Sequence, residues 1–84
     1  MNETLEIKSI LLKSIDEMEL SVRSYNCLQA AGIKYIHELV NKEENQMLKY
    51  KNFGRKSLTE LIEKLDSMNL QFGMQVDKIM AEEV

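Results

Sequence analysis

The segment KNFGRKSLTEL, residues 51–61, places a glycine and two adjacent cations at the start of an apolar-striped helix. Apolar residues then recur at the spacing of one helical face, namely Leu58, Leu61, Ile62, Leu65 and Met68. Gly54 lies just before this stripe, as a residue of a tight turn does. The pattern therefore predicts a hairpin at residues 51–54, followed by the clearest helix of the chain.

A second glycine follows an earlier predicted helix. Ser21 is a suitable N-cap for a helix that runs to about Ala31. The expected buried face of this helix consists of Val22, Tyr25 and Leu28. Gly32 then accepts the left-handed conformation that ends many helices, and Ile33 can fold back on Leu28 as in a Schellman motif. The sequence thus predicts two hairpins that each contain a glycine and join two helices.

The other predicted elements are shorter. They are a turn or irregular helix at residues 14–20, a helix at 36–41, a helix of about two turns at 44–51 and an extended segment at 70–74. Residues 1–9 are predicted to be a flexible N-terminal linker and residues 76–84 a flexible acidic tail, around a helical domain at 10–75. The expected fold is all-α, a compact bundle of four to five short helices with helix–hairpin–helix-like elements.

Composition is that of one small soluble domain. The sequence has 84 residues, of which 44% are hydrophobic and 30% charged. A single cysteine excludes an internal disulfide and suits a reducing compartment. The sequence shows no secretory signal and no apolar run of membrane-spanning length. We therefore expect a cytoplasmic protein without a membrane partner.

Charge is unevenly distributed along the sequence. The formal net charge is −3, yet residues 49–57 contain four cations and no acid. These cations are Lys49, Lys51, Arg55 and Lys56. An acidic protein with one basic edge is polarised, and such polarity orients a molecule on a charged partner.

Ser57 and Glu60 at the start of the last predicted helix allow two interpretations. Their spacing matches a capping box, in which the serine caps one amide and the glutamate reaches back to another. A helix N-terminus also accepts an anion, Gly54 leaves room for a phosphate, and Lys56 adds a positive charge. The sequence leaves both interpretations open.

Arg23 and Asn26 are three residues apart on the helix that follows Ser21. Either they are solvated surface residues, or they lie beside Gly54 and Lys56 if both hairpins present the same edge. In the second case the arginine suits the negative potential of a narrow A/T-rich minor groove, and the asparagine suits the acceptors there.

The sequence gives little indication of an enzyme active site. Cys27 and His37 are the only residues of their types, and one of each does not make a tetrahedral zinc site. No nucleophile–base spacing or nucleotide-binding loop is present, so we expect no catalytic residue, cofactor or metal. The acidic pairs are either solvated ledges or contact surfaces for a basic partner; they are Glu17 with Glu19 and Glu43 with Glu44.

Two long segments carry a family resemblance. ILLKSIDEMELSVRSYNCLQAAGIKYIHELV at residues 10–40 and LKYKNFGRKSLTELIEKLDSMNLQFGM at residues 48–74 resemble the C-terminal domain of the α subunit of bacterial RNA polymerase. The most specific motifs are ELSVRSYNCL and NFGRKSL. The resemblance implies a compact helical domain on a flexible tether that binds A/T-rich upstream promoter DNA through the minor groove.

The resemblance also implies roles for individual residues. The DNA-binding residues would be Arg23, Asn26, Cys27, Lys49, Gly54, Lys56, Ser57 and Glu60, with Arg23 as the principal residue in the groove. The regulator-binding residues would be Glu17, Glu19, Glu43 and Glu44, facing the σ factor or transcription activators. The domain would join the remaining polymerase subunits through its parent chain and would have no active site of its own.

This sequence departs from the family pattern at two places. Many members have a proline where this protein has Ser14 and Lys51, and losing a proline loosens a turn. Lys51 also adds a cation near the predicted DNA edge. The alternative to DNA binding is a helical protein–protein interaction module in which both hairpins are purely structural.

Overall fold

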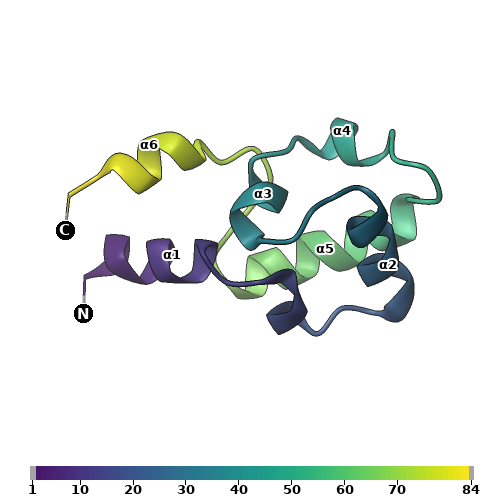
Figure 1. The fold of residues 1–84 in the computed structure, drawn as a ribbon, viewed down its shortest axis with the longest axis horizontal. Coiled ribbons are helices and arrows are strands. Elements are labelled where there is room, and N and C mark those ends of the chain that lie inside the picture. The colour runs from purple at the N-terminus through teal and green to yellow at the C-terminus, as the bar shows by residue number, and fades with distance from the viewer. Residues whose placement is uncertain (1, 84) are drawn as a thin grey trace.

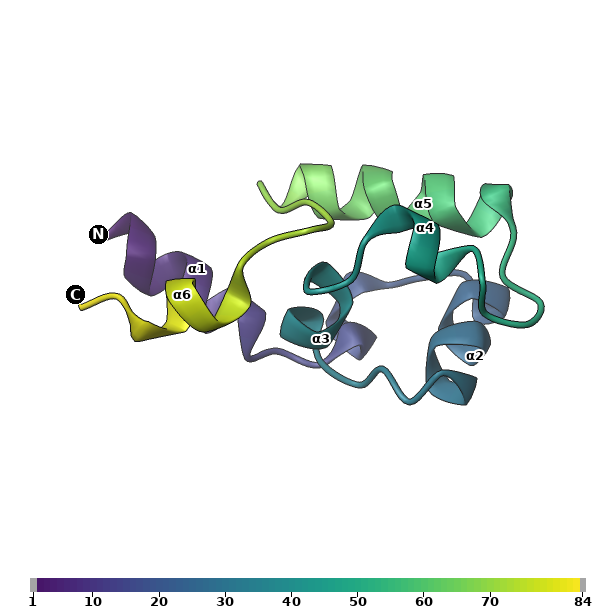
Figure 2. The same cartoon turned by 90° about the horizontal axis from the view of Figure 1, so that it is seen from above.

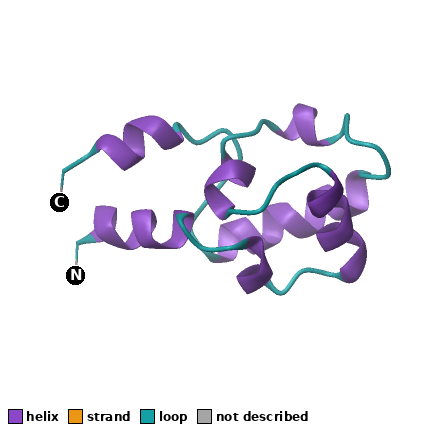
Figure 3. Ribbon diagram, viewed as in Figure 1, coloured by secondary structure: helices purple, strands orange, loops and turns teal. Residues whose placement is uncertain are grey.

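The computed structural model describes residues 2–83, and within this range the protein is helical throughout its regular structure (Figures 1 and 3). Its elements are α1 (Glu3–Leu11), the 3-10 helix η1 (Ile15–Met18), α2 (Val22–Ala30), α3 (Ile36–Val40), α4 (Glu44–Met47), α5 (Arg55–Ser67) and α6 (Val76–Ala81). One isolated bridge joins Ser14 to Tyr35. The predicted all-α fold is confirmed, with more helices than expected.

Helix α5 runs along one side of the molecule and lies below α3 and α4 in the first view (Figures 1 and 2). Leu61 and Leu65 on this helix are fully buried and Leu58 nearly so. They pack in one cluster with apolar residues of every other element, including Leu11, Ile15, Leu28, Ile36, Leu39, Val40 and Met47. Helix α2 contacts α5 directly, whereas α1 contacts α3 and α6, so the cluster is built from several pairs of helices.

Helix α2 begins and ends as its sequence predicts. The Ser21 hydroxyl accepts a hydrogen bond from the Ser24 amide at 3.2 Å. At the other end Gly32 has a φ of +78°, and its amide donates to the Gln29 carbonyl at 3.0 Å. The Ile33 amide donates to the Leu28 carbonyl at 3.0 Å. These two bonds form the predicted Schellman motif.

Two side chains lie elsewhere than their spacing suggested. Val22 is 76% exposed, and Ser24 is fully buried in its place on the inward face of α2. Ile62 is 38% exposed, because α5 buries the stripe Leu58, Leu61 and Leu65 and leaves position 62 at its edge. Apolar spacing identified both helices, but the rotation of each about its axis depends on what packs against it.

The second hairpin differs from the first in its backbone. Gly54 has an extended φ of −117°, and the left-handed residue is Asn52, with a φ of +65°. Asparagine tolerates this conformation better than other non-glycine residues. The fold itself therefore does not require a glycine at position 54, where an added Cβ would meet no atom within 4 Å.

Residues 70–74 lie back on the core without forming a strand. The Gly73 amide donates to the Lys42 carbonyl at 2.8 Å, and the Met74 amide donates to the Val40 carbonyl at 2.9 Å. Leu70 is buried under this segment. These contacts join the end of α5 to the end of α3, and they lead the backbone into α6.

The two ends of the protein are helical where a linker and a tail were predicted. Asn2 caps α1 by accepting hydrogen bonds from the amides of Thr4 at 2.8 Å and Leu5 at 3.3 Å. Helices α1 and α6 contact each other and lie side by side in both views, at one end of the elongated molecule (Figures 1 and 2). Each helix buries only part of its apolar surface against the other and the core, which is why neither has a clear sequence period.

This pairing corrects the secondary structure expected for residues 3–9 and 76–81. Ile7 and Ile10 on α1 and Ile79 and Met80 on α6 are half-buried against the core. Met1 and Val84 lie outside the described residues. The flexibility of the two segments and the domain boundaries at residues 10 and 75 remain predictions.

We predict that Gly32→Ala lowers the free energy of unfolding by about 1 kcal/mol, because alanine is strained at a φ of +78°. Gly32→Asn should cost about half as much, since asparagine tolerates the left-handed region. Urea unfolding followed by circular dichroism measures both. Equal losses for the two variants would contradict a conformational cause.

Candidate nucleic-acid interface

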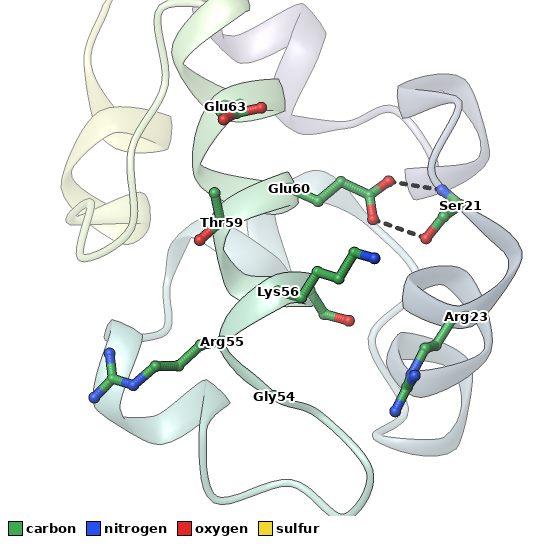
Figure 4. Close-up of a pocket in the computed structure, with 9 residues that line it drawn as sticks. Ser21, Arg23, Gly54, Arg55, Lys56, Thr59, Glu60 and Glu63 are labelled. Atoms are coloured by element: carbon green, nitrogen blue, oxygen red, sulfur yellow. Dashed lines mark hydrogen bonds between the residues drawn. The ribbon is translucent and has the colours of Figure 1, made fainter.

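An open groove lies between the N-terminal ends of α2 and α5 (Figure 4). It has a volume of about 650 Å³. Its lining residues are Ser21, Arg23, Gly54, Arg55, Lys56, Ser57, Thr59, Glu60 and Glu63. The fold therefore brings together five residues that the sequence analysis selected from two distant segments: Arg23, Gly54, Lys56, Ser57 and Glu60.

The Glu60 carboxylate joins the two walls of this groove. One oxygen accepts hydrogen bonds from the hydroxyls of Ser21 at 2.7 Å and Ser24 at 2.6 Å. The other oxygen accepts from the Ser21 amide at 2.7 Å. Figure 4 shows the carboxylate reaching from α5 to Ser21. Glu60 thus supports the N-terminus of α2, in place of the predicted capping box with Ser57.

These hydrogen bonds act on the pKa of Glu60. Partial burial raises this pKa, but the hydrogen bonds from Ser24 and Ser21, together with the nearby charge of Lys64, outweigh it. The net result is a lowered pKa, so the carboxylate is charged at neutral pH. The charged form is also the better acceptor for three donors at once.

The N-terminus of α5 keeps its own amides free. Gly54 is the N-cap and has no side chain to offer, and Ser57 is buried inside the first turn at 6% exposure. No group in residues 2–83 accepts a hydrogen bond from the amides of Arg55, Lys56 or Ser57. Unpaired amides and the helix dipole make this end of α5 suitable for an anion.

The cations around the groove are also unpaired. Among residues 2–83 the single ion pair joins Lys13 to Glu17 at 3.8 Å, far from the groove in sequence. In Figure 4 the Lys56 side chain points from α5 towards α2, Arg23 lies on the opposite wall, and Arg55 points away from α2. Two cations in the first turn of a helix oppose its dipole, a local cost that an external anion would relieve.

Three other predicted DNA-binding residues lie outside the groove lining. Asn26 is exposed on α2, one turn beyond Arg23, and Lys49 is exposed after α4. Cys27 is half-buried, and its thiol donates to the Asn52 carbonyl at 3.2 Å. This contact ties α2 to the hairpin before α5, so Cys27 holds the two segments in register.

The acidic pairs occupy two separate places. Glu17 belongs to η1 and Glu19 follows it with a φ of +54°, whereas Glu43 and Glu44 begin α4. Figure 1 shows η1 and α4 at opposite edges of the bundle. The predicted regulator contacts would therefore be two surfaces that a single small partner does not span.

Several residues that line the groove, or lie buried behind it, were not predicted as part of a site. Ser24, which is buried behind the groove, was unassigned, and Ser21 was identified only as a helix cap. Arg55 was counted as a cation, but Thr59 and Glu63 had no role. The serine pair Ser21 and Ser24 carries a weak signal, because a serine three residues inside an amphipathic helix needs a polar partner when it is buried. Nothing local identifies that partner as Glu60.

Among the residues that the structure describes, no group of three or more histidine, cysteine, aspartate or glutamate side chains is arranged to hold a metal ion. In the same range, every helix is too short or too polar to cross a membrane.

Comparison with known proteins relates this sequence to one family. The family described as the carboxy-terminal domain of the bacterial RNA polymerase alpha chain matches residues 1–67. The sequence is 55% identical over 80 residues to the DNA-directed RNA polymerase subunit alpha of Salinibacter ruber, with 95% of this protein and 24% of that one covered. It is 58% identical over 73 residues to the same subunit of Maridesulfovibrio salexigens, with 87% and 21% covered.

The fold is similar to a solved structure of the same domain from another protein. The NMR structure of the carboxy-terminal domain of the RNA polymerase alpha subunit from Helicobacter pylori matches with a TM-score of 0.74 and 32% sequence identity. The match extends over 95% of the present protein and 72% of that one. By contrast, the sequence spans only 24% and 21% of the length of the two full-length relatives.

We predict that Glu60→Gln lowers the free energy of unfolding by about 1 kcal/mol at pH 7, because glutamine keeps one acceptor oxygen and turns an N–H group towards the Ser21 and Ser24 donors. Because the pKa of Glu60 is lowered in the folded state, its contribution is complete above the unfolded pKa of about 4.3 and is lost as the pH falls through the folded value. Urea unfolding across this pH range measures the difference.

Glu63→Gln is the matched control, since Glu63 is exposed on the same helix and its side chain has no hydrogen-bond partner in residues 2–83. It should change stability by less than about 0.5 kcal/mol. A loss for Glu60→Gln that stayed constant down to pH 3 would rule out the charged carboxylate as its cause.

Proposed function

The protein belongs to the family of the carboxy-terminal domain of the bacterial RNA polymerase alpha chain, and we propose that it binds A/T-rich DNA upstream of promoters. The observation that carries this proposal is the groove in which Arg23 on α2 faces Gly54 and Lys56 on α5. One wall has a guanidinium without a partner among residues 2–83, and the other has free amides at a helix N-terminus.

The two walls suit two different parts of a DNA duplex. Arg23 enters the minor groove, where a narrow A/T-rich tract concentrates negative potential, and Asn26 reaches acceptors at the groove floor. The first turn of α5 receives a phosphate on its amides, with Lys56 as an added charge and Gly54 allowing close approach of the backbone. Lys49 adds a cation at the margin.

In this proposal Glu60 and Cys27 act by fixing the positions of other residues. Glu60 supports the start of α2 and so fixes the position of Arg23 in its first turn. Cys27 fixes the hairpin through its contact with Asn52. Because minor-groove recognition depends on matching a groove about 6 Å wide, a shift between α2 and α5 would misplace Arg23 relative to the phosphate site.

We propose tethered recruitment as the mechanism. A weakly binding domain linked to the rest of a polymerase raises the effective concentration of that enzyme at a promoter without any catalytic group of its own. The remaining polymerase subunits are then partners through the parent chain, in the cytoplasm. The σ factor or activators would contact Glu17 and Glu19 on one edge, and Glu43 and Glu44 on the other.

We predict that Arg23→Ala weakens binding to an A/T-rich duplex at least tenfold at low salt, because the groove-inserting charge is lost. Lys34→Ala removes an exposed cation outside the groove and should change affinity less than twofold. Fluorescence anisotropy with A/T-rich and G/C-rich duplexes measures both variants. Unchanged folding is checked by circular dichroism.

Equal affinity of wild type and Arg23→Ala would overturn the proposal. So would an absence of any duplex binding at low salt. Either result would favour the alternative, a helical protein–protein interaction module whose acidic edges are its working surfaces and whose hairpins serve only the fold.

The salt dependence gives a separate prediction. If about four phosphates are neutralised, the logarithm of the association constant should fall with the logarithm of salt concentration at a slope of about −3 to −4. Lys56→Ala should reduce the magnitude of this slope by about 1, whichever duplex is used. An unchanged slope would show that Lys56 does not contact the backbone.

A further inference from the structure

Two cations of the basic edge are not explained by the groove between α2 and α5. Lys51 lies outside the groove lining, and Arg55, although it belongs to the lining, has a side chain that points away from α2 (Figure 4). Both residues are exposed, and neither forms an ion pair within residues 2–83. We call Lys51 and Arg55 the outer pair.

The turn that carries Lys51 is anchored on both sides. The Phe53 amide donates to the Tyr50 carbonyl at 3.2 Å and closes a four-residue turn. Asn52, the third residue of this turn, has a φ of +65°, while Lys51 is not among the residues with a positive φ, as in a type II turn. Phe53 is buried in the core, and the Asn52 carbonyl accepts the hydrogen bond from the Cys27 thiol at 3.2 Å. Lys51 therefore occupies the outer corner of a well-held turn.

Arg55 is directed by its place in the first turn of α5. It follows the Gly54 N-cap and precedes Lys56. Successive side chains are about 100° apart around a helix, so these two cations leave it in different directions. Figure 4 shows Lys56 extending towards α2 and Arg55 pointing to the other side. The first turn thus presents one cation to the groove and one away from it.

The surface around the outer pair has the composition of a polyanion contact. Its apolar residues Tyr50 and Phe53 pack against the core, and no acid occurs in residues 49–59. The exposed residues from 49 to 56 are Lys49, Lys51, Asn52, Gly54, Arg55 and Lys56. A protein partner is usually held by aromatic or other large anchors. A phosphate backbone needs only cations and polar groups, so this surface favours DNA over a protein.

The spacing of the outer pair also suits a nucleic-acid backbone. Lys51 and Arg55 are four residues apart in sequence, so their backbones are at most about 14 Å apart. Phosphates of one DNA strand follow one another every 3.4 Å or so along the helix axis, about. The two cations can therefore reach different phosphates of one strand.

We propose that Lys51 and Arg55 bind backbone phosphates outside the minor groove, on the side of α5 away from Arg23. The inference rests on the proposed function and deepens it, because the outer pair supplies about two of its roughly four phosphate contacts. Backbone contacts carry no sequence information. The outer pair therefore raises affinity for every duplex and leaves the preference for A/T-rich DNA to Arg23 and Asn26.

The double variant Lys51→Ala/Arg55→Ala tests this assignment in the full 84-residue protein. Fluorescence anisotropy over a range of salt concentrations measures its affinity for A/T-rich and G/C-rich duplexes. The salt slope should become shallower by about 2 on both duplexes, and the ratio of the two affinities should stay within about twofold of wild type. A slope change below about 0.5, or a loss confined to one duplex, would overturn the proposal.

Lys34→Ala/Lys78→Ala is the matched control. It removes two exposed cations outside the basic edge and makes the same change of net charge. Its salt slope should stay within about 0.5 of wild type. Equal slope changes for the two double variants would show attraction by net charge alone and would overturn the proposal.

Lys51→Pro separates the charge of this residue from its turn. Proline is common at the second position of a type II turn, and the Lys51 amide donates no hydrogen bond within residues 2–83. The variant should lower the magnitude of the slope by about 1 and leave the urea midpoint at or above that of wild type. If the midpoint falls, Lys51→Met provides the slope with the backbone unaltered. An unchanged slope would show that Lys51 does not contact phosphate.

Arg23→Ala distinguishes failure of this inference from failure of the proposed function. If Arg23→Ala weakens duplex binding and Lys51→Ala/Arg55→Ala leaves the salt slope unchanged, only the outer pair is overturned. If the wild type binds no duplex at low salt, both are overturned. Loss of A/T preference in Arg23→Ala, with a shallower slope and intact preference in the double variant, supports both.

Discussion

The arrangement of the groove depends on one carboxylate. Glu60 sits in the second turn of α5 and accepts three hydrogen bonds from the start of α2, a segment 36 to 39 residues away in sequence. Without it the Ser24 hydroxyl would be buried with no acceptor, and the first turn of α2 would lose its hydrogen bonds to α5. The same carboxylate thus secures the fold and sets the distance between Arg23 and the N-terminus of α5.

This arrangement separates the tasks of the two helix N-termini. The start of α2 is capped twice, by Ser21 next to it in sequence and by Glu60 from across the groove, so the amides of Ser21 and Ser24 have internal acceptors. The start of α5 is capped by a glycine and keeps its amides and cations free among residues 2–83. Free donors and unpaired cations cost stability in isolation. Their concentration at one edge is what makes binding of a polyanion there physically reasonable, despite a net charge of −3.

Local chemistry explains which parts of the fold were predictable. The end of α2 was predicted correctly because Gly32 and Ile33 act through bonds within one turn, and the apolar stripe of α5 was predicted because its period is set by its own residues. The pair Ser57 and Glu60 was misinterpreted, since a capping box and a cross-helix contact have the same spacing. Helices α1 and α6 were read as a linker and a tail because each is stabilised by the other, and neither carries a full apolar face.

The candidate site, too, has features that the sequence predicts and features that only the tertiary structure decides. The sequence by itself determined the helical class, the two ends of α2, the basic edge at residues 49–57 and the resemblance that selected Arg23 and Gly54, because these follow from composition, short-range bonds and motifs. Only the tertiary structure decided that Glu60 faces α2 and that Val22 and Ile62 are exposed. The reason is physical: a helix can rotate about its axis without changing its own hydrogen bonds, so its orientation is set by the packing of distant residues.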